Sequence, residues 1–128
     1  MIIGIGTDIV ELARLGKAIK HGGDAFLKRV YTPKELDEGQ LRLEYLGGRW
    51  AAKEAASKAL GCGIGSGCAF TDIEISSDSS SGAPVLNCTA PAARSLKEHH
   101  RGLRWHVSIS HEHAYAVATV IVEEDSSL

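Results

Sequence analysis

The chain has 128 residues, 44% of them hydrophobic and 23% charged, with a formal net charge of −2. This length is typical of one domain, so we expect a single domain over residues 1–128, and the composition excludes a largely disordered chain. The mildly acidic balance argues against a nucleic-acid-binding protein. The apolar runs are too short to span a bilayer and the first residues lack the pattern of a secretory leader, so we expect a cytoplasmic protein without a membrane partner.

The N-terminal segment predicts a strand followed by a helix. Residues 2–5 are apolar and are punctuated by Gly4 and Gly6, which indicates a strand that another backbone approaches closely. Asp8 stands three residues before Glu11, which is the spacing of a helix N-cap and its capping box. Position alone therefore gives Asp8 two interpretations, a helix cap or a functional carboxylate.

Short helices are expected next. An apolar stripe at helical spacing covers residues 12–19 and is stopped by Gly22–Gly23, after which residues 24–30 predict a second helix. A capping-box sequence that begins at Thr32, with proline in the first turn, predicts a brief helix that ends near Gly39.

Residues 41–60 predict one long helix that ends at Gly61. Small residues that can pack closely against a sheet occupy Ala51, Ala52, Ala55, Ala56 and Ala59. Trp50, Glu54 and Lys58 follow one another at four-residue steps and therefore share one face. Taken alone, Glu54 and Lys58 have the spacing of an ordinary surface ion pair.

The remainder of the chain is predicted to be rich in β-structure. Alternating or β-branched segments predict four strands, over residues 72–76, 84–88, 105–110 and 115–122. A helix over residues 90–100 is expected to begin with Thr89 as its N-cap. We therefore expect an α+β fold with a small, mostly antiparallel sheet, one long helix and several short helices.

A hard cation suits the carboxylates of this chain better than zinc or serine-hydrolase chemistry suits its histidines. No third ligand has zinc-site spacing near His111, and no Gly-x-Ser-x-Gly sequence exists. Two carboxylates, Asp8 and Glu54, are enough for Mg²⁺, which takes its other ligands from water and from the phosphates of a substrate. Lys58 would pair with the same phosphates. Together with the glycine-rich loop over residues 61–67, whose backbone amides can turn toward an anion, these residues indicate phosphoryl-type transfer.

The segment from Leu12 to Lys34 has six basic residues and one acidic residue, Asp24. The basic residues are Arg14, Lys17, Lys20, Lys28, Arg29 and Lys34. They form either a docking surface for an acidic partner or a solvated helical face.

Four motifs also follow one another in a recognisable order. They are Gly4-Ile-Gly-Thr-Asp8-Ile-Val-Glu11, Arg49-Trp-Ala-Ala-Lys-Glu54-Ala-Ala-Ser-Lys58-Ala-Leu-Gly61, Ser81-Gly-Ala-Pro84 and Ser108-Ile-Ser-His111. This order resembles that of the holo-[acyl-carrier-protein] synthase family, the short, single-domain type of 4′-phosphopantetheinyl transferase. The resemblance covers essentially the whole chain, and its specific part is the Lys-Glu-Ala-x-x-Lys block joined to an upstream Gly-x-Asp.

The resemblance implies the 4′-phosphopantetheinyl transferase fold and an enzyme of fatty acid biosynthesis. Such an enzyme moves 4′-phosphopantetheine from coenzyme A to a serine of apo acyl carrier protein and releases adenosine 3′,5′-bisphosphate. Asp8 and Glu54 resemble the Mg²⁺ ligands, and one of them would accept the proton of the serine. Lys58 resembles the residue that supports the leaving phosphate, so these three are the expected catalytic residues.

The resemblance also implies contacts to the coenzyme and to partners. The coenzyme A pocket would be lined by Arg49, Trp50, Ser57, Lys58 and Gly61, and the nucleotide part would contact Gly82, Pro84, Ser110 and His111. Family members are homotrimers whose active sites lie between two subunits. The acidic carrier protein would dock on Arg14, Lys17, Lys28 and Arg29. Two departures from the family, Trp50 in place of phenylalanine and Ser81 in place of a frequent asparagine, leave the fine shape of the pocket open.

One alternative comes from a different class of protein. In a non-catalytic carrier-binding module, Glu54 and Lys58 would be a surface ion pair and Asp8 a helix cap. A transfer assay separates this alternative from the enzyme.

Overall fold

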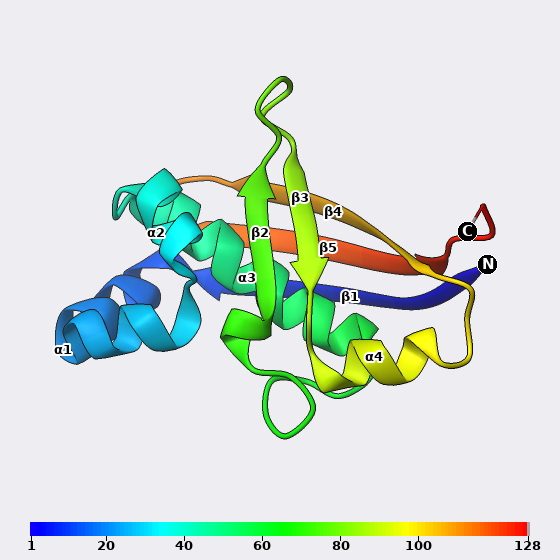
Figure 1. Cartoon of the computed structure of the whole chain (residues 1–128). Coiled ribbons are helices and arrows are strands. Elements are labelled where there is room, and N and C mark those ends of the chain that lie inside the picture. Colours follow the sequence, from blue (N-terminus) through cyan, green and yellow to red (C-terminus); the bar gives the residue numbers. More distant parts are fainter. Residues whose placement is uncertain (128) are drawn as a thin grey trace.

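The computed structural model describes residues 1–127 and has the expected α+β composition. In chain order the elements are β1 (Ile2–Glu11), α1 (Leu12–Val30), α2 (Pro33–Gly39), α3 (Leu43–Ala59), the short 3₁₀ helix η1 (Phe70–Asp72), β2 (Ile73–Ser77), β3 (Pro84–Cys88), α4 (Pro91–Lys97), β4 (Leu103–His111) and β5 (Tyr115–Glu124) (Figure 1). The first residues of β1 and the last of β5 lie side by side at one end of the molecule.

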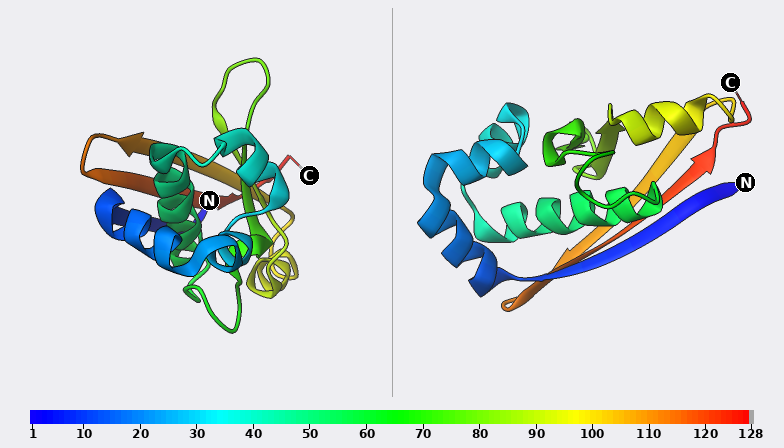
Figure 2. Two further views of the ribbon diagram at one scale, coloured as in Figure 1. Left: turned by 90° about the vertical axis from the view of Figure 1, so that its left-hand side faces the viewer. Right: turned by 90° about the horizontal axis from the view of Figure 1, so that it is seen from below.

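Three antiparallel strands form the main sheet, in the order β1-β5-β4. In the middle strand Ala118 lies opposite Asp8 on one side and opposite Ile109 on the other. Strands β2 and β3 form a separate antiparallel hairpin that crosses α3 on the side away from the main sheet (Figures 1 and 2). The single small sheet expected from the sequence is therefore two sheets with the long helix between them.

Close packing of α3 against β1 explains the small residues in both elements. The alanines of α3 that were expected to face a sheet are all buried: Ala51, Ala52, Ala55, Ala56 and Ala59. A Cβ on Gly4 would overlap the carbonyl oxygen of Ala59, and a Cβ on Gly6 would overlap that of Ala55. The prediction that another backbone approaches Gly4 and Gly6 is confirmed, and the approaching backbone is that of α3.

The predicted capping box at Asp8 and Glu11 is wrong. Strand β1 continues through Asp8 to Glu11, and α1 begins at Leu12 without a side-chain cap. The reason is tertiary: β5 pairs with β1 as far as Glu11, opposite Tyr115, and the ladder outweighs the local capping pattern.

Three other local predictions concern a helix break and two helix N-caps, and two of the three are confirmed. The break at Gly22–Gly23 is confirmed, because Gly23 has a φ of 60° and separates two helical segments inside α1. The capping box of α2 is confirmed, with Glu35 N donating to Thr32 Oγ1 at 3.3 Å. Thr89 is not the N-cap of α4, which is Ala90; the Thr89 hydroxyl donates instead to the carbonyl oxygen of Asp72, at 3.4 Å.

The face of the main sheet opposite α3 is covered by no other element of residues 1–127 (Figure 2). Large apolar side chains lie on this face with much of their area exposed: Ile5 (64%), Ile9 (63%), Tyr115 (42%) and Val117 (38%). We call these four residues the open sheet face. Across the part of the chain that the structure describes, no helix has the length and apolarity needed to cross a bilayer.

Candidate active site

Two carboxylates from distant parts of the chain line one pocket of about 390 Å³: Asp8 of β1 and Glu54 of α3. Side chains alternate along a strand, so Asp8 is on the same side of β1 as Gly4 and Gly6. Those glycines allow β1 to lie directly against α3. The close contact between strand and helix is therefore what brings Asp8 and Glu54 together.

Lys58 lies beside these carboxylates, but its partner is not the one that helical spacing suggests. Its Nζ is 3.3 Å from Asp8 Oδ1 and donates to the carbonyl oxygen of Thr7 at 3.0 Å. Among the ion pairs of residues 1–127 there is none between Lys58 and Glu54. The structure therefore contradicts the alternative in which Glu54 and Lys58 form a surface ion pair.

The pKa of the Glu54 carboxyl is raised above its usual value. Burial is the largest cause, the negative charge of Asp8 raises it further, and the positive charge of Lys58 offsets part of the effect. Two carboxylates that repel each other in a pocket favour a bound cation. The donor set fits a hard cation such as Mg²⁺, because the two side chains would offer only carboxylate oxygens and would leave the other positions to water and substrate oxygens.

An aromatic stack forms the apolar wall of the same pocket. The ring of Trp50 is 4.7 Å from that of Phe70 and 6.0 Å from that of Phe26, with an interplanar angle of 13° to Phe26. Both Trp50 and Phe26 line the pocket. Trp50 is thus a core residue whose outer surface is also part of the pocket wall.

A second pocket, of about 580 Å³, is rich in cationic and imidazole groups. It includes two residues expected to contact the coenzyme, Arg49 and His111. Arg49 is mostly buried, and its guanidinium donates to Ile75 O at 3.2 Å and to Ser77 Oγ at 3.1 Å. Arg42 and His113 also line this pocket and were not predicted; the signals available in the sequence were a cation directly before the long helix and a His-x-His pair.

Other predicted coenzyme contacts are dispersed over this chain. Ser57 is buried, and its hydroxyl donates to Glu54 O at 2.7 Å. Gly61 ends α3 with a φ of 84°. Gly82 lies in the turn of the β2–β3 hairpin and Pro84 begins β3, and neither lines the two pockets above. Ser110 is exposed near the end of β4, and with His111 it borders a shallow pocket on the open sheet face.

The basic residues expected to bind a carrier protein all stand on α1 and are exposed: Arg14, Lys17, Lys28 and Arg29. Arg14 also lines the pocket of Asp8 and Glu54. The guanidinium of Arg29 lies over the ring of Phe26, 5.5 Å from its centroid. The basic surface therefore borders the carboxylate pocket.

We compared the chain with models of known protein families to find the class of protein that has this fold and this pair of carboxylates. The model of the 4′-phosphopantetheinyl transferase superfamily matches residues 4–120, and the chain belongs to this superfamily. Within it the chain is similar to the holo-[acyl-carrier-protein] synthase of Shewanella denitrificans, with 49% identity over 125 residues that cover 95% of this chain and 98% of the relative. The resemblance expected from the four motifs is confirmed.

Solved structures agree with this assignment. The holo-[acyl-carrier-protein] synthase of Helicobacter pylori, in complex with coenzyme A, superposes with a TM-score of 0.83 at 34% identity and covers 93% of this chain and 99% of its own. The enzyme from Neisseria meningitidis gives a TM-score of 0.83 at 40% identity and covers 97% of this chain and 100% of its own.

Proposed function

We propose that this chain transfers the 4′-phosphopantetheine moiety of coenzyme A to a serine of an apo acyl carrier protein. The products are the holo carrier protein and adenosine 3′,5′-bisphosphate. The observation that carries this proposal is the convergence of Asp8 and Glu54 at one pocket, with Lys58 paired to Asp8, in a chain of this family.

The two carboxylates are the proposed ligands of Mg²⁺. The ion, when bound, supplies charge neutralisation for the pyrophosphate of coenzyme A. Either carboxylate is able to accept the proton of the attacking serine. Lys58 keeps its ammonium at the edge of the pocket, with half of its side-chain area exposed, and is placed to support the leaving phosphate.

Coenzyme A is proposed to extend from the carboxylate pocket toward cationic groups. Trp50 offers an apolar surface beside the carboxylates, and the second pocket offers Arg42 and His111 to phosphate groups. Gly61, Gly82 and Ser110 are exposed and Pro84 is partly exposed, which leaves them accessible to a nucleotide. Ser57 supports the site from inside α3 through its hydrogen bond to Glu54 O.

We propose that the active form is a homotrimer with each site between two subunits. The open sheet face supports association, because four large apolar side chains lie exposed on one face of the sheet. Ile9 and Val117 are direct register partners on it. A neighbouring subunit would also bring a second copy of Gly82, Pro84 and His111 to a site that one chain does not complete.

The exposed basic side chains of α1 are the proposed docking surface for the carrier protein. Arg14, Lys17, Lys28 and Arg29 offer positive charge next to the carboxylate pocket, and an acidic partner would be attracted to it. Docking there would present the carrier serine to Asp8 and Glu54.

A transfer assay tests the proposal directly. Purified protein is incubated with apo acyl carrier protein, coenzyme A and Mg²⁺, and the carrier is weighed by mass spectrometry. We expect a phosphopantetheine adduct that is absent when the enzyme is omitted or when the metal is chelated. If the carrier binds but never gains the adduct, the chain is a non-catalytic carrier-binding module; an adduct that forms equally well after chelation would overturn the metal assignment.

A further inference from the structure

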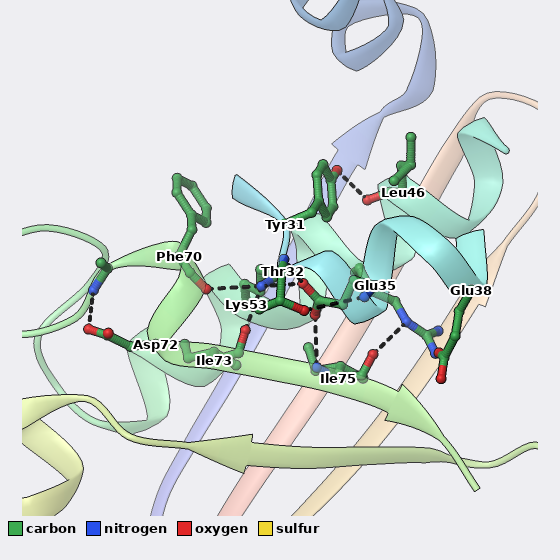
Figure 3. Close-up of polar contacts among 12 residues, drawn as sticks. Tyr31, Thr32, Glu35, Glu38, Leu46, Lys53, Phe70, Asp72, Ile73 and Ile75 are labelled. Carbon is green, nitrogen blue, oxygen red and sulfur yellow. Dashed lines mark hydrogen bonds and ion pairs between the residues drawn. The ribbon is translucent and has the colours of Figure 1, made fainter. Parts of the chain in front are cut away.

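Lys53 and Glu35 form an ion pair in the interior, with no exposed side-chain area on either residue. Lys53 Nζ lies 2.8 Å from Glu35 Oε1 and also donates to the carbonyl oxygens of Phe70, at 2.9 Å, and of Ile73 (Figure 3). An ammonium has three N–H donors, and each of them has an acceptor here.

Both carboxylate oxygens of Glu35 also accept hydrogen bonds. Its Oε1 accepts from Thr32 N at 2.8 Å, in the capping box of α2, and its Oε2 accepts from Ile75 N at 2.8 Å. The pair therefore joins α3, α2, η1 and β2 at one point, as Figure 3 shows. No buried side-chain polar atom of residues 1–127 is left without a partner.

A gain in folding stability does not by itself explain why this ion pair is buried. Removing two charges from water costs free energy, and apolar residues of similar volume often give equal or greater stability. The pair makes directional contacts. An ammonium held by three fixed acceptors restricts the rotation of α3 about its own axis. An apolar side chain at the same place would make no such directional contact.

The rotation of α3 matters because the neighbours of Lys53 line the carboxylate pocket. Glu54 is the next residue, and Trp50 stands three residues before Lys53. Phe70, whose carbonyl oxygen binds Lys53, also stacks on Trp50 at a centroid distance of 4.7 Å. One ammonium thus joins the helix that presents Glu54 to the backbone of the residue whose ring stacks behind the pocket wall.

We propose that Lys53, held by Glu35, is a positioning residue for the transfer reaction. It orients Glu54 and Trp50 toward the pocket and does not touch the substrate. The inference rests on the proposed function. Binding of coenzyme A depends less on this pair, because Arg49 ties the outer part of β2 to α3 separately through Ile75 O and Ser77 Oγ.

The test is the neutral double variant Lys53→Met/Glu35→Gln. It removes both charges together and keeps a glutamine that can serve the capping box of α2. We expect a folded protein by circular dichroism, a kcat lowered roughly 10²-fold, and a KM for coenzyme A changed by a much smaller factor. The matched control is Arg104→Met/Asp125→Asn, which removes an exposed pair with a 3.1 Å contact and should keep the parent kcat.

A folded double variant with the parent kcat would overturn the inference, and so would a rise in KM for coenzyme A at unchanged kcat. Should the double variant not fold, Glu35→Asp, which keeps both charges and shortens the reach of the carboxylate by one methylene, is judged by the same split between kcat and KM. An inactive parent would instead count against the proposed function.

A second readout then decides the positioning role without any turnover. In a Trp105→Phe background Trp50 is the one remaining tryptophan. The double variant should change its near-ultraviolet circular dichroism, and an unchanged spectrum contradicts the inference.

Discussion

Lys58 Nζ lies 3.3 Å from Asp8 Oδ1, so an ion pair joins the last turn of α3 to the middle of β1 at the edge of the carboxylate pocket. Glu54, one helical turn before Lys58, is left with a raised pKa and the like charge of Asp8 beside it. The lysine neutralises one carboxylate and leaves negative charge at the other. This asymmetry suits a site that receives a cation together with a phosphorylated substrate.

Replacing Glu54 by glutamine should remove transfer and leave the fold intact. We expect a loss of roughly 10²–10⁴-fold in kcat, because a proton acceptor and a metal ligand disappear together. The free energy of unfolding should not fall, since the repulsion with Asp8 disappears as well. The mass-spectrometric assay and thermal unfolding measure the two quantities. Glu98→Gln, an exposed glutamate after α4, is the control; a Glu54→Gln variant that stays active but loses stability would support a purely structural role.

Lys58→Met should separate activity from stability. An exposed ion pair contributes about 0–1 kcal/mol, so the unfolding free energy should change little. Loss of the ammonium that supports the leaving phosphate should lower kcat roughly 100-fold. Steady-state kinetics and denaturant unfolding test this, with Lys97→Met on the exposed end of α4 as the matched control. Equal kinetics for the two variants would exclude Lys58 from catalysis.

Gly6→Ala should be strongly destabilising. Its Cβ would overlap the carbonyl oxygen of Ala55, and neither backbone can move without separating β1 from α3, so we expect a loss of about 3 kcal/mol or more. Gly16→Ala is the matched control in α1, where the nearest atom is Leu43 Cδ2 at 3.6 Å. That substitution should raise stability by about 0.4–1 kcal/mol. Urea unfolding of both variants is the measurement, and similar midpoints would contradict the close packing of strand and helix.

Ile5→Asp should dissociate the proposed trimer. Ile5 lies on the open sheet face with 64% of its area exposed, so the charge costs little in one free chain but a great deal when the face is covered. Leu41, exposed to 63% in the turn before α3, provides the control Leu41→Asp. Analytical ultracentrifugation should give a trimer for the parent and the control and a smaller species for Ile5→Asp. A trimer in all three would place the interface elsewhere.

Asp78 should make the β2–β3 turn sensitive to acid. Hydrogen bonds from the hydroxyl and amide of Ser80 and the amide of Ser81 lower the pKa of the Asp78 carboxyl below its usual 3.8. A lowered pKa stabilises the folded state above the unfolded pKa, and the effect disappears as the pH falls through the folded pKa.

The measurement is the difference in unfolding temperature between the parent and Asp78→Asn, followed from about pH 6 to about pH 2. We expect the difference to be constant at the upper end and to vanish at the lower end. Asp37→Asn serves as the control, because Asp37 is an exposed residue of α2, away from the hairpin turn. A difference that does not depend on pH would contradict the role of the Asp78 charge.

Local signals in the sequence were reliable where neighbours in the chain supply the interaction. The capping box of Thr32 and Glu35 and the break at Gly23 are both made by residues close in sequence, and both are confirmed. The strands β4 and β5 were predicted from their own alternation. The order of the motifs gave the family, which the comparisons confirm.

The sequence by itself determined the elements whose hydrogen bonds close locally, and it supplied the residue types of the site. Only the tertiary structure decided that Asp8 is in a strand, that Lys58 pairs with Asp8 and not with Glu54, and that Lys53 is buried against Glu35. The physical reason is the same in all three cases. Each partner comes from a distant segment, and whether a charge is paired, capped or solvated depends on which surface the fold brings to it.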